Sequence, residues 1–266
     1  MRETLTRLLS GIVYIVLLAA AVYFSKESFL ILFGVFLMIA VVEFCNLVNL
    51  NKTAPLLIAG FGYLLFATFP ATIITLHLLL LATLLVSARC IFFLFDDSAR
   101  IDDDMSKYVF VIGYVILPFI LLTKIPFQDI YYNPEVIFGM FILIWTNDTF
   151  AFIVGKTMGQ NKLFERISPK KTIEGFVGGV GFSLVVAAII TRFSNEKLYF
   201  WVAIALIVSI MGTLGDLVES KFKRLAGVKD SGTIMPGHGG ILDRLDSVIF
   251  AAPFVFLFYQ ILYYVS

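Results

Sequence analysis

The sequence predicts an all-α, polytopic integral membrane protein, a helical bundle of about nine transmembrane helices with its N-terminus in the cytoplasm. The first observation is composition. Of the residues, 60% are hydrophobic and only 15% are charged, against roughly 45–50% and 25% in soluble domains. The second is the length of the uncharged runs, which is about that of a membrane-spanning helix. The third is a one-sided distribution of lysine and arginine between the loops.

The apolar runs define the individual spans. A run of about 20 residues crosses the hydrocarbon core as a helix, and the alternating pattern typical of a transmembrane β-barrel is absent from the sequence. The third run is short and is separated from the fourth by Pro70, so this pair is predicted to form either a tight hairpin or one broken element. The runs lie at about 8–24, 29–50, 56–69, 71–95, 108–125, 136–155, 176–193, 198–217 and 247–265.

The charges of the loops give the orientation. With nine spans, the N-terminus and the loops after spans two, four, six and eight share one side. That side holds sixteen of the twenty lysines and arginines, and such an excess marks the cytoplasmic side. We therefore expect a protein of the cytoplasmic membrane whose long polar loops, 156–175 and 218–246, face the cytoplasm. The other four basic residues are Lys26, Lys124, Arg192 and Lys197.

The polar residues divide the chain into two regions. Region 1–125 holds N-terminal transmembrane helices joined mostly by short loops, and region 126–266 holds the two long loops and the candidate catalytic groups. The acidic segment 96–107 belongs to the first region. Its acids lie in turn-like sequence with no neighbouring Gly or His scaffold, so we interpret it as a solvated connection rather than a metal site.

One aspartate falls inside an apolar run. Asp148, in WTNDTFAF, interrupts the sixth predicted span. A carboxylate at the middle of a membrane costs on the order of 2.5–3.5 kcal/mol, so such a residue normally faces a polar cavity and has a partner. We interpret Asp148 as part of a binding site. The alternative is a structural aspartate paired with a basic residue of another span.

The segment SPKKTIEG places two adjacent bases, Lys170 and Lys171, beside the next span. They suit a phosphate-bearing substrate, but they also fit a role in binding anionic lipid headgroups or in setting topology. The glycines that follow have the small-residue spacing of closely packed membrane helices: Gly175, Gly178, Gly179 and Gly181.

Residues 215–247 concentrate charge between the last two spans. If span eight continues as a helix past Asp216, a polar face forms at helical spacing. If span nine begins near Leu242, Asp243 and Asp246 are neighbours on one face. Carboxylates at two helix ends are hard oxygen ligands that suit Mg²⁺, bases neutralise phosphates, and glycine amides at a helix start approach an anion closely. The first of these faces would carry Asp216, Glu219, Ser220 and Lys223.

The same segment resembles a family signature. SKFKRLAGVKDSGTIMPGHGGILDRLDS is similar to the phosphatidate cytidylyltransferases, in which S-x-x-K-R, K-D, P-x-H-G-G and D-R-x-D occur in this order and at this spacing. NDTFAF (147–152) and SPKKTIEG (168–175) also resemble the family. The resemblance is strong over about 145–250 and only compositional before that.

The resemblance implies transfer of CMP from CTP to phosphatidic acid, giving CDP-diacylglycerol and pyrophosphate for phospholipid biosynthesis, and it implies a homodimer. We expect Asp216 and Asp243 to be the principal ligands of Mg²⁺ (or Mn²⁺), with Asp246 or Asp148 completing a second cation position of open identity. His238 is expected to donate to a phosphate or to the leaving group, or else to orient the glycine-rich turn. We expect no nucleic-acid partner.

These interpretations give two sets of candidate residues. The expected catalytic residues are Asp216, Asp243, Asp246, Lys223, Arg224, His238 and Arg244. The expected substrate-binding residues are Asp148, Ser168, Lys170, Lys171, Thr172, Glu174, Ser220, Lys229, Asp230, Gly239 and Gly240.

Two other functions are compatible with a polar site in a helical membrane bundle. A CTP-dependent polyprenol or lipid kinase would also handle CTP, but the complete HGG and DR-x-D pattern argues against it. A cation-coupled transporter would use Asp148 as its ion site, but such proteins favour internal repeats and sites near the midplane. No repeat of fixed period is visible in the sequence.

Overall fold

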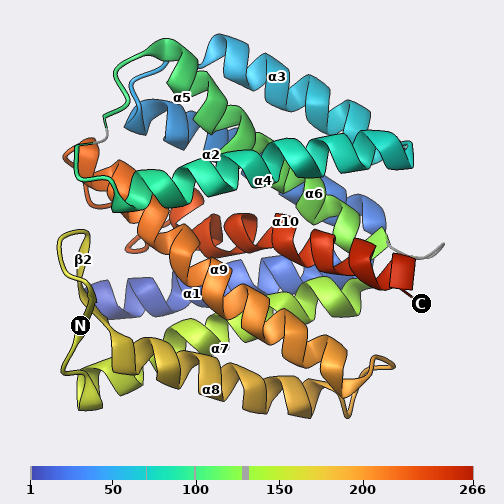
Figure 1. Cartoon of the computed structure of the whole chain (residues 1–266), viewed down its shortest axis with the longest axis vertical. Helices are drawn as coiled ribbons and strands as arrows, with labels where there is room; N and C mark the ends of the chain where they lie inside the picture. The colour runs from blue at the N-terminus through green and yellow to red at the C-terminus, as the bar shows by residue number, and fades with distance from the viewer. Residues whose placement is uncertain (1, 70, 99, 128–131, 266) are drawn as a thin grey trace.

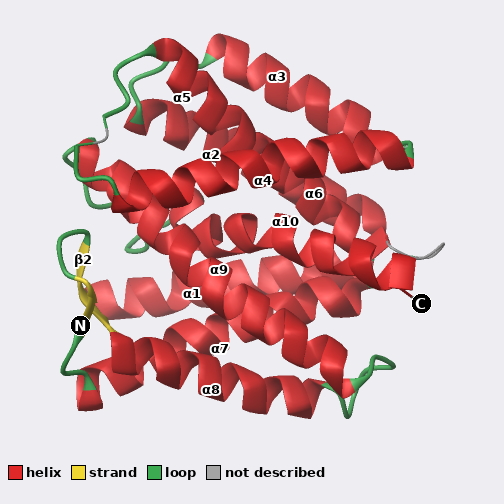
Figure 2. Cartoon of the chain, viewed as in Figure 1, coloured by secondary structure: helices red, strands yellow, loops and turns green. Residues whose placement is uncertain are grey.

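The protein is a bundle of apolar helices in the computed structural model, which describes residues 2–69, 71–98, 100–127 and 132–265. Figure 2 shows helix nearly throughout, with one two-stranded hairpin. Two shorter apolar helices, Leu9–Phe24 and Thr53–Ala67, coincide with the first and third predicted spans. An all-α polytopic membrane protein is therefore confirmed. Seven described helices are long and apolar enough to cross a membrane: Lys26–Leu47, Ile73–Phe95, Asp104–Phe127, Pro134–Met158, Ile173–Ile190, Leu198–Leu225 and Leu242–Leu262.

The elements follow the predicted apolar runs, with shifts at their ends. Pro70, which the prediction placed between the third and fourth spans, lies outside the described residues. The first half contains α1 (Arg2–Phe24), α2 (Lys26–Leu47), α3 (Thr53–Tyr63), the π-helical turn η1 (Leu64–Thr68), α4 (Ile73–Phe95), α5 (Asp104–Phe110), the π-helical turn η2 (Val111–Ile116), α6 (Leu117–Lys124) and the 3-10 turn η3 (Ile125–Phe127). The second half contains α7 (Pro134–Met158), β1 (Lys162–Phe164), β2 (Ser168–Thr172), α8 (Ile173–Ile190), α9 (Leu198–Leu225) and α10 (Leu242–Val265).

The polar connections gather at one end of the bundle. In Figure 1 the N-terminus, the hairpin and the loops after α2, α4 and α9 lie on the left, whereas the C-terminus lies on the right. These are the segments predicted to share one side and to hold most of the lysines and arginines. Successive apolar helices therefore run in alternating directions, as the predicted topology requires.

The two long polar loops are shorter than predicted. The connection between α9 and α10 comprises residues 226–241 instead of 218–246, and the one between α7 and α8 comprises 159–172 instead of 156–175. Hydropathy marks where apolar sequence ends, but the backbone of a helix continues as long as its hydrogen bonds do. Both conditions for the predicted polar faces are met, because α9 continues past Asp216 and α10 begins at Leu242.

An antiparallel hairpin and close helix packing hold α7 and α8 together. The strands pair Lys162 with Thr172, so the hairpin returns the chain directly to the start of α8. A Cβ on Gly175, Gly178 or Gly179 would overlap an atom of α7, whereas one on Gly181 would meet no atom of the described residues within 4 Å. The prediction of close packing is therefore confirmed for the first three glycines and wrong for Gly181, where a side chain would have open space.

Aromatic side chains fix the last turns of α9. The ring of Phe222 is buried, with its centroid 4.9 Å from that of Phe44 on α2 and 5.0 Å from that of Phe93 on α4. It also lies 5.3 Å from Phe110 on α5 and 5.5 Å from Tyr114 in η2. Such pairs each contribute about 0.5–1.5 kcal/mol beyond the burial of their area. Four elements of the first half therefore position the polar face of α9.

Candidate active site

Three carboxylates from two helices form a cluster where α9 ends and α10 begins. Asp216 and Glu219 lie on α9 and Asp246 lies on α10, with one oxygen of each within 4.8 Å of the others. A separation of three residues puts Asp216 and Glu219 on one helical face. Glu219 is fully buried and Asp246 is nearly so, while the Asp216 side chain is 31% exposed. The cluster is therefore accessible from the side of Asp216.

Two lysines balance the charge of this cluster. Lys223, one turn after Glu219, forms ion pairs with Glu219 and, at 2.6 Å, with Asp243. Lys171, on β2, forms an ion pair with Asp216. Burial by itself lowers the pKa of Lys171, but the Asp216 carboxylate outweighs burial, and the pKa rises above its ordinary value of 10.5. Lys171 is therefore a fixed positive charge at neutral pH.

Asp243 holds the loop 226–241 against α10. Its Oδ2 accepts hydrogen bonds from the Ser231 amide at 2.8 Å, the Ser231 hydroxyl at 2.9 Å and the Gly240 amide at 2.7 Å. Its Oδ1 accepts from Lys223. We expected the Gly240 N–H to approach a phosphate, but it donates its hydrogen bond to the carboxylate of Asp243.

The carboxylates that cluster differ from those expected. We expected Asp216 and Asp243 to share a cation, with Asp246 or Asp148 at a second position, whereas the carboxylates that lie within 4.8 Å of Asp216 are those of Glu219 and Asp246. Asp243 is linked to the cluster through Lys223, which forms ion pairs with both Asp243 and Glu219. The metal role of Asp243 stays a prediction, and Glu219 joins the candidate ligands.

A further buried carboxylate reaches this region from the first half of the chain. Glu43, on α2, is 3% exposed. Its Oε1 accepts from the Ile241 amide at 3.1 Å and its Oε2 from the Leu242 amide at 2.8 Å. Backbone donors at a helix start have no partner within the helix, so a carboxylate there satisfies them. The first half therefore contributes directly to the candidate site.

The glycine-rich turn places His238 against α1. The turn is closed by the His238 amide, which donates to the Met235 carbonyl at 2.9 Å. Gly237 has a φ of +77°, which glycine readily adopts after proline in a type II turn. Ser10 Oγ donates to the Pro236 carbonyl at 2.9 Å and lies 2.8 Å from His238 Nδ1. Because the serine hydroxyl has one hydrogen, Nδ1 carries a proton and donates to Ser10.

Two residues predicted to bind substrate have their polar atoms engaged within the hairpin loop. Thr172 Oγ1 accepts from the Gly175 amide at 3.1 Å and caps α8. The Glu174 carboxylate accepts from the amides of Gln160 at 3.1 Å and Asn161 at 3.2 Å, which closes the loop onto α8. These contacts give both residues a structural role, and no described contact tests a role in substrate binding.

Asp148 lies on the open side of the cluster. Its side chain is exposed and interacts electrostatically with Asp216, Lys171 and Arg244.

Ser220 Oγ lies 3.4 Å from Asp216 Oδ1. Among the other predicted residues, Ser168 and Gly239 are partly buried, and the following are exposed: Lys170, Arg224, Lys229, Asp230 and Arg244.

The cluster has the chemistry of a divalent-cation site. Its donors are carboxylate oxygens, which Mg²⁺ prefers. Glu219 Oε1 is buried and has no hydrogen-bond partner among the described residues, and a buried carboxylate oxygen of this kind needs a cation or another donor. With two lysines beside it, the site suits a cation together with a polyanion such as a triphosphate.

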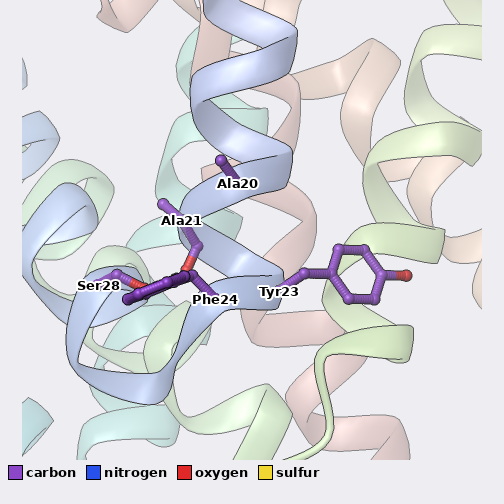
Figure 3. A pocket seen from close by; sticks show the side chains of 5 residues that line it. All are labelled: Ala20, Ala21, Tyr23, Phe24 and Ser28. Atoms are coloured by element: carbon purple, nitrogen blue, oxygen red, sulfur yellow. Dashed lines mark hydrogen bonds between the residues drawn. The ribbon is translucent and has the colours of Figure 1, made fainter.

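An apolar hollow lies far from this cluster. It measures about 510 Å³ and lies at the turn between α1 and α2 (Figure 3). Ser10, which contacts His238, precedes Phe24 by fourteen residues on α1, a distance of about 21 Å along the helix. The hollow is therefore not part of the candidate site. Its lining residues are Ala20, Ala21, Tyr23, Phe24 and Ser28.

The sequence matches a known family over nearly its whole length. Residues 5–262 fit the cytidylyltransferase family. The chain belongs to this family. It is 47% identical to the phosphatidate cytidylyltransferase of Staphylococcus saprophyticus over 144 residues, which are 53% of this chain and 54% of the relative. It is 54% identical to the phosphatidate cytidylyltransferase of Staphylococcus haemolyticus over 115 residues, which are 42% of this chain and 44% of the relative. The matches thus span about half the length of these curated relatives.

Membership of the cytidylyltransferase family confirms the resemblance seen in the sequence, and the structure adds residues that the signature does not contain. Glu219 had a detectable signal, because it shares a helical face with Asp216. Glu43 had the same signal that singled out Asp148, a lone carboxylate inside an apolar run. Ser231 and Ser10 had none, because their role depends on which distant residues they meet.

Proposed function

We propose that this chain transfers CMP from CTP to phosphatidic acid, giving CDP-diacylglycerol and pyrophosphate. An oxygen of the lipid phosphate attacks the α-phosphorus of CTP. The bond from that phosphorus to the oxygen bridging to the β-phosphate breaks, and pyrophosphate leaves. The observation that carries the proposal is the cluster of Asp216, Glu219 and Asp246, flanked by Lys171 and Lys223, in a membrane-spanning member of the cytidylyltransferase family.

The location of the cluster suits two substrates from different phases. Phosphatidic acid lies in the bilayer and CTP in water, so their phosphates meet at the membrane boundary. The cluster lies at the last turns of α9 and the first turns of α10, where apolar spans end. We propose that this end faces the cytoplasm and that the membrane is the cytoplasmic one, since sixteen of the twenty lysines and arginines belong to this side.

A bound Mg²⁺ or Mn²⁺ would neutralise charge on the triphosphate and on the leaving pyrophosphate. Asp216, Glu219 and Asp246 are the residues that would hold it, and Glu219 Oε1 is the donor that has no described hydrogen-bond partner. Asp148, exposed beside Asp216, would help to hold a second cation.

The residues of the chain orient and neutralise the phosphates, and none of them needs to act as a general base. The second pKa of a phosphate monoester is about 6, so the lipid phosphate is already an anionic nucleophile at neutral pH. The exposed bases Lys170, Arg224 and Arg244 are available to bind phosphate oxygens. His238, whose Nδ1 proton is held by Ser10, would donate from its other ring nitrogen to a phosphate when protonated.

One assay tests this proposal against its rivals. Detergent-purified protein receives phosphatidic acid, Mg²⁺ and CTP that is radiolabelled at either the α- or the γ-phosphorus. The proposal requires the α label to enter the lipid and the γ label to leave in pyrophosphate, and EDTA to stop both. Transfer of the γ label to the lipid would identify a kinase, and a cation-coupled transporter would label no lipid. The absence of α label from the lipid refutes the proposal.

We also propose the homodimer that the family resemblance implies. Light scattering of the protein in detergent, with the detergent mass subtracted, tests this. A mass of twice 29.8 kDa supports the dimer, and a single-chain mass contradicts it.

A further inference from the structure

One buried carboxylate of the first half has contacts that the proposed reaction does not explain. Glu43 lies on α2, and its partners are Ser231, Ile241 and Leu242, about two hundred residues later in the chain. A buried carboxylate is costly unless donors satisfy it. Here two backbone amides and a serine hydroxyl lie within 3.5 Å of its oxygens. The hydrogen bonds from the loop and the start of α10 therefore satisfy the buried carboxylate of Glu43.

Glu43 and Asp243 divide the donors at the start of α10 between them. The amide of Gly240 donates to Asp243, and the next two amides, those of Ile241 and Leu242, donate to Glu43. The Ser231 hydroxyl lies 2.9 Å from Asp243 and 3.4 Å from Glu43, so it links the two carboxylates. Three successive backbone donors, two just before α10 and one at its first residue, are thus all satisfied by side chains.

The loop is shaped around the Glu43 carboxylate. A Cβ on Gly232 or on Gly240 would overlap its oxygens. The glycines therefore allow the backbone to approach Glu43 closely from two sides of the loop. Both segments are held to α2 through this one side chain.

We infer that Glu43 is a positioning residue for the cation site, and this inference rests on the proposed function. Glu43 fixes the first turn of α10, and Asp246 follows only four residues after Leu242. If the amides of Ile241 and Leu242 lose their acceptor, the start of α10 shifts or frays. Asp246 then no longer meets Asp216 and Glu219 at its place in the cluster.

The Glu43→Gln variant keeps the shape of the side chain and removes its charge. The amide nitrogen of the new glutamine side chain faces the backbone N–H of either Ile241 or Leu242. That backbone N–H group then has no acceptor. Residues that orient metal ligands typically contribute 10–100-fold to metal affinity or activity. We expect kcat to fall at least about tenfold, with the KM for CTP changed less than about threefold, and Mn²⁺ binding to weaken about tenfold. The electron paramagnetic resonance signal of free Mn²⁺ measures the binding without any turnover.

Leu37→Ala is the matched control, because it opens a cavity in the buried core on the same helix, six residues before Glu43. It should lower the thermal midpoint while leaving Mn²⁺ binding within about twofold of wild type, since it loses only packing. Mn²⁺ binding equally weakened in Leu37→Ala would overturn the inference, because general destabilisation would then explain both variants. Unchanged Mn²⁺ binding in folded Glu43→Gln would overturn it as well.

Hydrogen exchange of the unmodified protein provides a test that does not need a folded variant. The amides of Ile241 and Leu242 should exchange much more slowly than those of the exposed Lys229 and Asp230. Equal rates would overturn the inference. Wild-type protein that binds Mn²⁺ but transfers no CMP would refute the proposed reaction alone, and the Mn²⁺ comparison would still decide the role of Glu43.

Discussion

Replacing Lys223 by methionine removes the ammonium group that lies between two buried carboxylates. Lys223 forms ion pairs with Glu219 and Asp243, whose side chains are 0% and 5% exposed. Methionine is similar in length, so the change removes charge and opens little space. Taking one partner out of a buried ion pair costs about 3–5 kcal/mol, because the remaining charge has no compensation. We expect a loss of this size in the free energy of unfolding.

The loss can be followed through the thermal midpoint. For chains of about this length, 1 kcal/mol shifts the midpoint by roughly 2–4 °C, so the expected decrease is about 6–20 °C. The fluorescence of Trp145 and Trp201 reports unfolding in detergent. EDTA is present throughout, so that no divalent cation replaces the lost charge.

Two comparisons make the result specific. Lys170→Met removes a lysine that is exposed, and its midpoint should stay within about 2 °C of wild type because an exposed charge contributes little. Adding Asp243→Asn to Lys223→Met should recover part of the loss, because it neutralises one of the stranded carboxylates. A midpoint of Lys223→Met within about 2 °C of wild type would show that the two carboxylates do not depend on this lysine.

Three further outcomes follow from the site. Asp243→Asn should reduce CMP transfer more than about tenfold while the protein still folds, because its four described hydrogen bonds hold the loop and Lys223; retention of more than about a tenth of the activity would remove Asp243 from the mechanism. Because the folded-state pKa of Lys171 is raised above 10.5, its stabilising contribution is complete below that pH and is lost as the pH rises through the folded-state pKa. The difference in midpoint between wild type and Lys171→Met should thus narrow as the pH rises above 10.5; a difference that stays unchanged above that pH would contradict it. Ser10→Ala removes the acceptor of the His238 Nδ1 proton and should lower kcat about two- to tenfold, the equivalent of one hydrogen bond of about 0.5–1.5 kcal/mol; an unchanged kcat and pH profile would show that the orientation of His238 does not depend on Ser10.

The spans were predictable because their signal is local. A run of apolar residues is detected without knowledge of its neighbours, and each predicted span has a matching apolar helix. The same holds for the helical spacing that joined Asp216 to Glu219, and for the glycines that let α8 approach α7. Helix ends were less predictable, because α9 continues through eight residues that hydropathy assigned to a loop.

The family signature lies within one continuous segment, so the residues around 145–250 were also identified from the sequence. What each of them contacts was not. Asp216 and Asp243 are equally prominent in that segment, yet Asp216 joins a carboxylate cluster while Asp243 binds backbone amides. The difference arises from the fold of the loop 226–241 over α10, which turns the Asp243 side chain toward that loop.

The sequence by itself determined that this chain is a membrane bundle with its polar groups at one end, and it identified most of the residues gathered there. Only the tertiary structure decided that Glu219 completes the cluster with Asp246, and that Glu43 holds the start of α10. The physical reason is the separation in sequence between the residues that interact. Hydropathy and helical periodicity act between residues a few positions apart, whereas the contact between Glu43 and Leu242 joins residues 199 positions apart and exists only once α2 and α10 have packed together.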